Sequence, residues 1–253
     1  MRIFLKTEDE IILLRAASQL ATRALIEVGR HVVPRLALSH LRNKVVNAVM
    51  RTVPTESNSG KEALSSDTEF TFFVNGAYIE PSLEGECMLC EGDWLTVNCW
   101  VCLDGYYSFG AHTFIVGSSQ DDEPLTSTLR DMLRQVVRRA SAGHSIKEMS
   151  RTVYSLHSHD PYVLQKTFGH GVGRNRVENP ILRMNPGVND TVLLKEGMCL
   201  VIALAFKHGR SHFIKPRLMH ESTFHNPFVP FGTTVVVRPG RPEILTSFET
   251  IVK

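Results

Sequence analysis

The sequence lacks long hydrophobic runs, a strong excess of charge of either sign, and an even set of cysteines. No stretch approaches the roughly 18 consecutive apolar residues that a membrane-spanning helix needs, although 43% of the 253 residues are hydrophobic. The 28 basic and 26 acidic residues leave a formal net charge of +2, so nucleic acid is not an expected partner. The composition is ordinary for a water-soluble protein with a hydrophobic core, and no membrane partner is expected.

The first ten residues lack the features of a targeting segment. The run Thr7-Glu8-Asp9-Glu10 makes this segment acidic before a long apolar run develops. That pattern is neither that of a secretory signal nor that of a transit peptide. We therefore expect a cytoplasmic protein.

Five cysteines form an odd set, which favours reduced thiols over a disulfide framework. Cys87 and Cys90, like Cys99 and Cys102, have the C-x-x-C spacing found in some zinc sites. However, Cys99 and Cys102 fall in a run typical of a strand, where residues three apart point to opposite faces. We expect ordinary thiols, and a four-thiolate zinc site is the alternative.

Helix and strand patterns occur twice in the same order. Capping boxes at residues 7–10 and 145–148 each predict the start of a helix, and Asp104-Gly105 predicts a hairpin turn. The expected helices cover about 8–28, 38–50, 124–140 and 145–156, and the expected strands cover about 69–75, 94–103, 106–116, 199–206, 212–214 and 233–237. Two helices followed by strands, repeated, predict one α+β domain over residues 1–253 with two similar halves.

The most informative segment runs from Phe168 to Arg174, where glycines bracket His170 so that the backbone passes close to a site and the imidazole projects into it. Together with residues 95–98, 104–106 and 194–198, this segment resembles the methionine aminopeptidases, the smallest members of the pita-bread metallopeptidase superfamily. The resemblance runs from about Leu5 to the C-terminus. It implies a pita-bread fold, in which two pseudo-twofold halves place helices outside a curved antiparallel sheet and the site lies between them.

Peptidases of that family hold two divalent ions with two aspartates, one histidine and two glutamates. Matched motif by motif, the resemblance assigns these ligand positions to Asn98, Phe109, His170, Ala203 and Gly232. Only His170 keeps the family's residue type. Two divalent ions need anionic oxygen ligands, and burying them uncompensated costs on the order of several kcal/mol per ion. We therefore expect a degenerate metal site and no metal cofactor, where the family would use two divalent ions.

The resemblance also implies three positions that line the cleft. Glu80 falls where the family has a substrate-facing histidine, and Val177 falls where it has a second catalytic histidine. Arg176 replaces an aromatic residue that helps to line the family's methionine pocket. The proton-handling groups and the apolar pocket therefore both depart from the family pattern, and no catalytic residue is assigned.

These replacements predict a pseudo-enzyme that has lost dinuclear metal binding and peptidase activity and binds a peptide or protein in or near the former cleft. Superfamily relatives without the metal site serve as ribosome-associated or histone-binding factors, so the resemblance implies that ribosome association is one such role. A protein whose fold is retained mainly for self-association or assembly is a third interpretation, and the sequence does not distinguish it from the pseudo-enzyme.

The alternative is an active but divergent methionyl aminopeptidase, or another hydrolase that releases N-terminal residues, with a relocated metal site. A mononuclear site is one form of this alternative. Its candidate ligands are His208, His212, His220 and His225.

Overall fold

The computed structural model describes residues 2–53, 64, 66–117, 124–157, 163–164, 167–184, 192–207, 228–247 and 251. The helices are α1 (Glu8–His31), α2 (Leu38–Thr52), α3 (Pro124–Arg138) and α4 (Ile146–His157), with a short 3-10 helix, η2 (Pro81–Leu83). The strands are β1 (Glu69–Val74), β2 (Ala77–Ile79), β3 (Trp94–Leu103), β4 (Tyr106–Ile115), β5 (Val163–Leu164), β6 (Thr167–Gly171), β7 (Glu178–Arg183), β8 (Cys199–Lys207), β9 (Phe228–Val236) and β10 (Glu243–Ile244).

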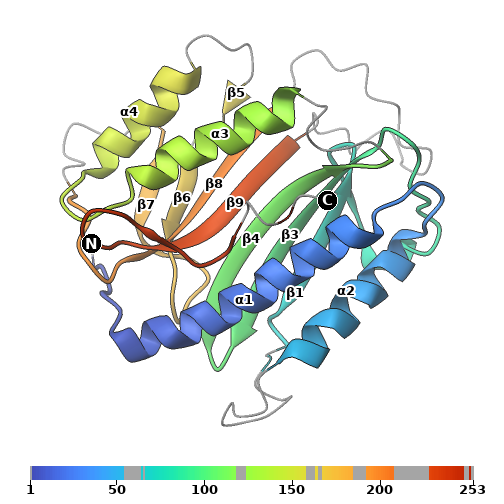
Figure 1. Ribbon diagram of the computed structural model, residues 1–253, viewed down its shortest axis with the longest axis horizontal. Helices are drawn as coiled ribbons and strands as arrows, with labels where there is room; N and C mark the ends of the chain where they lie inside the picture. The colour runs from blue at the N-terminus through green and yellow to red at the C-terminus, as the bar shows by residue number, and fades with distance from the viewer. Residues whose placement is uncertain are drawn as a thin grey trace.

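One antiparallel sheet runs through both halves of the chain, in the order β2-β1-β3-β4-β9-β8-β6-β7, with β10 on β9 and β5 on β8. The order is symmetric about the boundary between β4 and β9, because each half contributes a long hairpin-like pair and two outer strands. Figure 1 shows a curved sheet whose helices all lie on one face, with α1 and α2 over the first half and α3 and α4 over the second. This arrangement confirms the predicted α+β class with two similar halves. The assignment of residues 1–253 to one domain stays a prediction.

Local sequence signals start the helices where they were predicted. The Thr7 hydroxyl accepts a hydrogen bond from Glu10 N–H at 3.3 Å, and the Glu10 carboxylate accepts one from Thr7 N–H at 3.0 Å. Ser145 and Glu148 form the same reciprocal pair before α4. Each box satisfies backbone N–H groups that have no partner inside the helix.

The β3–β4 hairpin turns at Asp104 and Gly105, which both have positive φ angles, 48° and 76°. These values match the tight turn whose twist suits paired strands, and the hairpin keeps an unbroken register from Trp94 opposite Ile115 to Leu103 opposite Tyr106. Cys99 packs into the core beneath the helices, so Cys102, three residues on, points to the other face. All five cysteines are free thiols, as predicted.

Some predicted boundaries were wrong or fall outside the described ranges. The strand expected at 233–237 begins earlier, at Phe228. The sequence interpretation missed the strands β2, β5, β6, β7 and β10. The strand expected at 212–214 lies outside the described residues. None of the helices in the ranges described is both long and apolar enough to cross a membrane.

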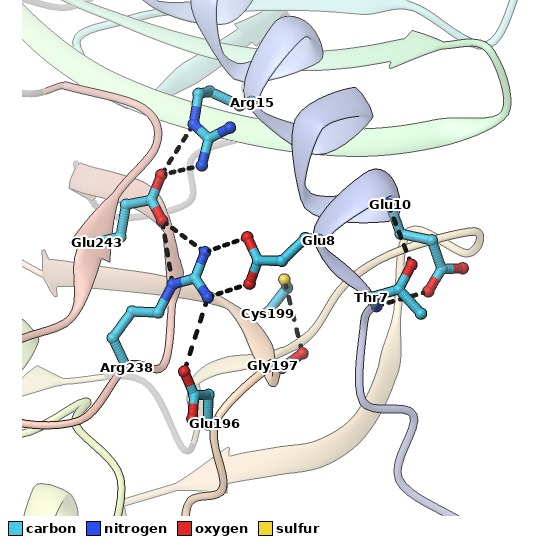
Figure 2. A network of polar contacts seen from close by, with 9 residues as sticks. All are labelled: Thr7, Glu8, Glu10, Arg15, Glu196, Gly197, Cys199, Arg238 and Glu243. Carbon is cyan, nitrogen blue, oxygen red and sulfur yellow. Dashed lines mark hydrogen bonds and ion pairs between the residues drawn. The ribbon is translucent and has the colours of Figure 1, made fainter.

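A network of charged residues connects the first turns of α1 with Arg238 and with Glu243 on β10 (Figure 2). Arg238 binds both Glu8 and Glu243, and Arg15 donates to Glu243 through Nε at 2.8 Å. The hydrogen bond from Arg238 is the main cause that lowers the pKa of Glu8. Because the carboxylate of Glu243 lies between two guanidinium groups, α1 is held against the turn that precedes β10.

Candidate functional site

The five positions matched to metal ligands lie on five adjacent strands of the sheet. In sheet order they are Asn98 on β3, Phe109 on β4, Gly232 on β9, Ala203 on β8 and His170 on β6. Ala111 pairs with both Asn98 and Gly232, and Gly232 pairs in turn with Ala203. The sheet thus brings together residues that are up to 134 positions apart in the sequence, counting from Asn98 to Gly232 (232 − 98).

These residues face away from the helices. Val97 and Cys99 belong to the core that packs against α1 and α2, so Asn98, which lies between them on the same strand, points to the opposite face. Trp100 shares that face with Asn98 for the same reason. The candidate site therefore occupies the face of the sheet that the helices leave uncovered (Figure 1).

Phe109 fills the middle of this site. A Cβ atom built on Gly232 would lie 2.6 Å from Cε1 of Phe109 and 3.1 Å from the Cβ of Ala203. Such distances are below ordinary van der Waals contact, so the ring occupies the space that a side chain at position 232 would need. The Phe109 side chain is itself buried.

Trp100 joins Phe109 to His170 in an aromatic stack that sequence analysis did not find. Its ring centroid lies 4.7 Å from that of Phe109, with the planes tilted by 45°. The centroid of the His170 ring lies 6.1 Å from that of Trp100, and the two rings are nearly parallel, at 8°. The available signal was that Trp100 follows Asn98 by two residues and therefore shares its face.

His170 is held in one tautomer. Its Nδ1 lies 2.8 Å from the carbonyl oxygen of Gly171, and because a carbonyl only accepts, Nδ1 carries the proton. Burial lowers the pKa of His170, and the hydrogen bond to Gly171 opposes that effect in part. Nε2 consequently keeps its lone pair and is the atom of this ring that could ligate a metal.

Asn98 supplies a neutral oxygen. Its Oδ1 is buried and has no hydrogen-bond partner among the described residues. Together with His170, it gives the five positions two neutral donor atoms and no carboxylate, while the Phe109 ring occupies the space next to Gly232. These residues do not fit two divalent ions, which need anionic oxygen ligands.

Arg176 lies at the edge of the aromatic stack. Its guanidinium carbon is 5.7 Å from the centroid of the Trp100 ring and 5.8 Å from that of Tyr107. It also forms an ion pair of 2.8 Å with Glu69, and its hydrogen bond is the main cause that lowers the pKa of Glu69. The described structure thus brings Arg176 into contact with the site.

The other two cleft-lining candidates lie nearer the surface. Val177 is 58% exposed. Glu80 is exposed at the N-terminus of η2, one residue after Ile79 on the edge strand β2. Their role in lining a cleft stays a prediction, as does the matching of the five positions to the family's ligands.

The fold and the sequence together define the class of this protein. Residues 12–239 match the model of the metallopeptidase family M24. Because the match covers most of the chain, the protein belongs to the metallopeptidase family M24.

Within that family, the chain is most readily compared with methionine aminopeptidases. It is 29% identical to the methionine aminopeptidase of Helicobacter pylori over 220 residues, which cover 83% of this chain and 85% of the relative. It is 25% identical to that of Borreliella burgdorferi over 254 residues, which cover 97% and 98% of the two chains. The family resemblance is therefore confirmed.

Solved structures agree on the fold. The methionine aminopeptidase of Thermotoga maritima has a TM-score of 0.79 at 21% identity, and the match covers 97% of this chain and all of that one (100%). The prolidase of Pyrococcus furiosus has a TM-score of 0.72 at 19% identity, over 97% of this chain and 66% of the prolidase. These matches confirm the pita-bread fold.

The expectation that this chain uses no metal cofactor is contradicted by these comparisons. The family is one of metallopeptidases, and relatives that cover nearly the whole chain are named as aminopeptidases. Metal dependence is therefore what membership implies, and the relatives do not support the interpretation of a protein without enzymatic activity. The misfit described above concerns the five matched positions alone.

Proposed function

We propose that this chain is a methionine aminopeptidase-like protein whose inherited site holds a peptide or protein segment without hydrolysing it. The single observation that carries the proposal is the Phe109 ring, which lies 2.6 Å from where a side chain at Gly232 would begin. In a dinuclear peptidase, two metal ions acidify the attacking water. At the five matched positions an aromatic ring occupies the space for ligand oxygens instead.

The groups at this site suit recognition of a polypeptide. Trp100 offers a large ring of intermediate exposure, and Arg176 adds a guanidinium group at its edge. Aromatic residues and arginine contribute a large share of the binding energy in protein interfaces. A protein or peptide partner, of which a ribosomal protein is one form, follows from this chemistry together with the net charge of +2. A cytoplasmic location stays a prediction.

The comparisons favour a second candidate function. The relatives are named as methionine aminopeptidases, which supports a divergent, active methionyl aminopeptidase whose metal is held by residues other than the five matched positions. The histidines at 208, 212, 220 and 225 that were considered for such a site lie outside the described residues.

One experiment separates the two candidates. The purified protein is incubated with methionyl peptides while cobalt, manganese, iron(II) or zinc is supplied, and cleavage, peptide binding and bound metal are all measured. We expect peptide binding without cleavage, and weaker binding after Trp100→Ala but not after Tyr154→Ala, which removes an exposed aromatic ring from α4. Cleavage with stoichiometric metal, lost on His170→Ala, would establish the second candidate instead.

A reversal variant tests the role of the five positions directly. The combined change Asn98→Asp, Phe109→Asp, Ala203→Glu and Gly232→Glu supplies four carboxylates around His170. Circular dichroism first checks that this variant is folded. We then expect it to bind two cobalt or manganese ions, and we expect this binding to be lost when His170→Ala is added. A wild-type protein that already binds two ions in a manner lost on His170→Ala would contradict the proposed misfit.

A further inference from the structure

A groove between α1 and α2 is lined by several basic side chains. It lies on the helix side of the sheet, away from the aromatic stack. It encloses about 350 Å³, which lies at the lower end of the range for small-molecule sites, about 300–1,000 Å³. Arg23, Glu27 and His31 line it from α1, and Lys44 and Arg51 line it from α2. Figure 1 shows these two helices packed side by side.

The three permanent cations of this groove have no partners in the described part of the chain. Arg23, Lys44 and Arg51 form no hydrogen bond or ion pair through their side chains there. The Nε atom of Arg23 is also buried. Leaving a buried donor without a partner is unfavourable, so this Nε atom is a site where an acceptor would stabilise the protein.

Among the described residues that line the groove, Glu27 is the one carboxylate. Its Oε1 lies 3.3 Å from Nδ1 of His31 and its Oε2 lies 3.6 Å from Nη1 of Arg30, and Oε2, although buried, accepts no hydrogen bond from the described residues. One carboxylate beside Arg23, Lys44 and Arg51 leaves an excess of positive charge in the groove. The position of Arg51 in the last turn of α2 also suits the helix dipole, but that effect does not explain Arg23, which lies in the middle of α1.

We infer that this groove binds a small phosphate-bearing anion. Guanidinium groups match the oxygens of a phosphate in a planar fork, and a lysine ammonium adds a point charge. Arg23 Nε gains a partner when an oxygen of the anion reaches it. The site shares no residue with the proposed peptide site, so the two inferences stand or fall independently.

Calorimetric titration with inorganic pyrophosphate tests this site. We expect one anion to bind per chain and the affinity to fall by about tenfold or more with each of Arg23→Gln, Lys44→Gln and Arg51→Gln, because each removes a charged partner. Lys44 and Arg51 are exposed, so their variants are expected to remain folded, which urea unfolding checks.

Two control variants separate a specific site from general attraction to a basic surface. Arg241→Gln removes an exposed cation from a turn near β10. Arg139→Gln removes one from the corresponding groove between α3 and α4, which encloses about 310 Å³. Both are expected to leave the affinity unchanged. No one-to-one binding of pyrophosphate, or an equal loss of affinity in the control variants, would overturn the inference.

Discussion

Gly232 lies beneath the ring of Phe109, so closely that an added Cβ would fall 2.6 Å from Cε1 of that ring. We expect Gly232→Ala to lower the free energy of unfolding by about 1–3 kcal/mol, the usual cost of overpacking a well-filled core. The measurement is urea denaturation followed by circular dichroism. Gly85→Ala is the matched control, because a Cβ at Gly85 meets no atom within 4 Å.

The same pair can be tested by a double-mutant cycle. Phe109→Leu shortens the side chain that causes the conflict, so Gly232→Ala is expected to cost less in that background than in the wild type. Equal costs in both backgrounds would mean that the ring does not determine what position 232 accepts.

Lys6 and Glu178 form a buried ion pair of 2.5 Å, with each side chain only 5% exposed. We expect Lys6→Met to destabilise the protein by about 3–5 kcal/mol, because it leaves a buried carboxylate without its partner. The double variant Lys6→Met with Glu178→Leu is expected to recover much of that loss, since it removes both charges. Urea midpoints of the two variants give the comparison, and a double variant no more stable than the single one would contradict it.

Glu10 is expected to make the stability of the fold depend on pH in the acid range. Its hydrogen bond from the Thr7 backbone, followed by that from the Tyr106 hydroxyl, lowers the pKa of Glu10 below its ordinary value of 4.5. A carboxyl group with a lowered pKa stabilises the fold above its unfolded value, and this contribution is lost as the pH falls through the folded value. We therefore expect the free energy of unfolding to fall below about pH 4.5, and to fall less steeply in Glu10→Gln. An unchanged slope in that variant would argue against the capping box as the cause.

The side chain of Thr234 on β9 forms hydrogen bonds with the backbone of Phe109 on β4. Its hydroxyl accepts from Phe109 N–H and donates to Phe109 C=O, both at 2.9 Å. Thr234→Val keeps the shape and removes both bonds, so we expect a loss of about 1–3 kcal/mol per unsatisfied buried group. Thr52→Val serves as the control, because that exposed hydroxyl bonds only to carbonyls of its own helix. Similar losses in both variants would show that the hydroxyl of Thr234 plays no special part.

Structural features that are set by residues close together in the sequence could be predicted from the sequence alone. The Thr7–Glu10 box and the Asp104-Gly105 turn are each decided by residues within one turn of chain. The edge strand β2 was missed because three residues, Ala77–Ile79, are too few to show alternation.

The candidate site could be predicted only in part. Motif matching placed Asn98, Phe109, His170, Ala203 and Gly232 on neighbouring strands, but it gave no sign of the stack around Trp100. Trp100 on β3 and His170 on β6 are separated in the sheet by β4, β9 and β8. Their rings meet because the sheet curves, and a local pattern of residues does not encode that curvature.

The prediction about metal was wrong for a different reason. It extended a loss of ligands at five positions to the whole chain, whereas family membership implies a metal-dependent protein. The physical argument about charge applies only to the residues around Phe109, and residues 208–227 lie outside the described ranges.

In the described strands, β4 and β9 are joined by one backbone pair, Ala111 with Gly232, and by hydroxyls such as that of Thr234. Each half of the sheet keeps its own ladder of hydrogen bonds on either side of this line. Side chains along this midline therefore join the two halves where backbone hydrogen bonds are few. A substitution at Phe109, Gly232 or Thr234 alters this junction, while the ladder within each half stays intact.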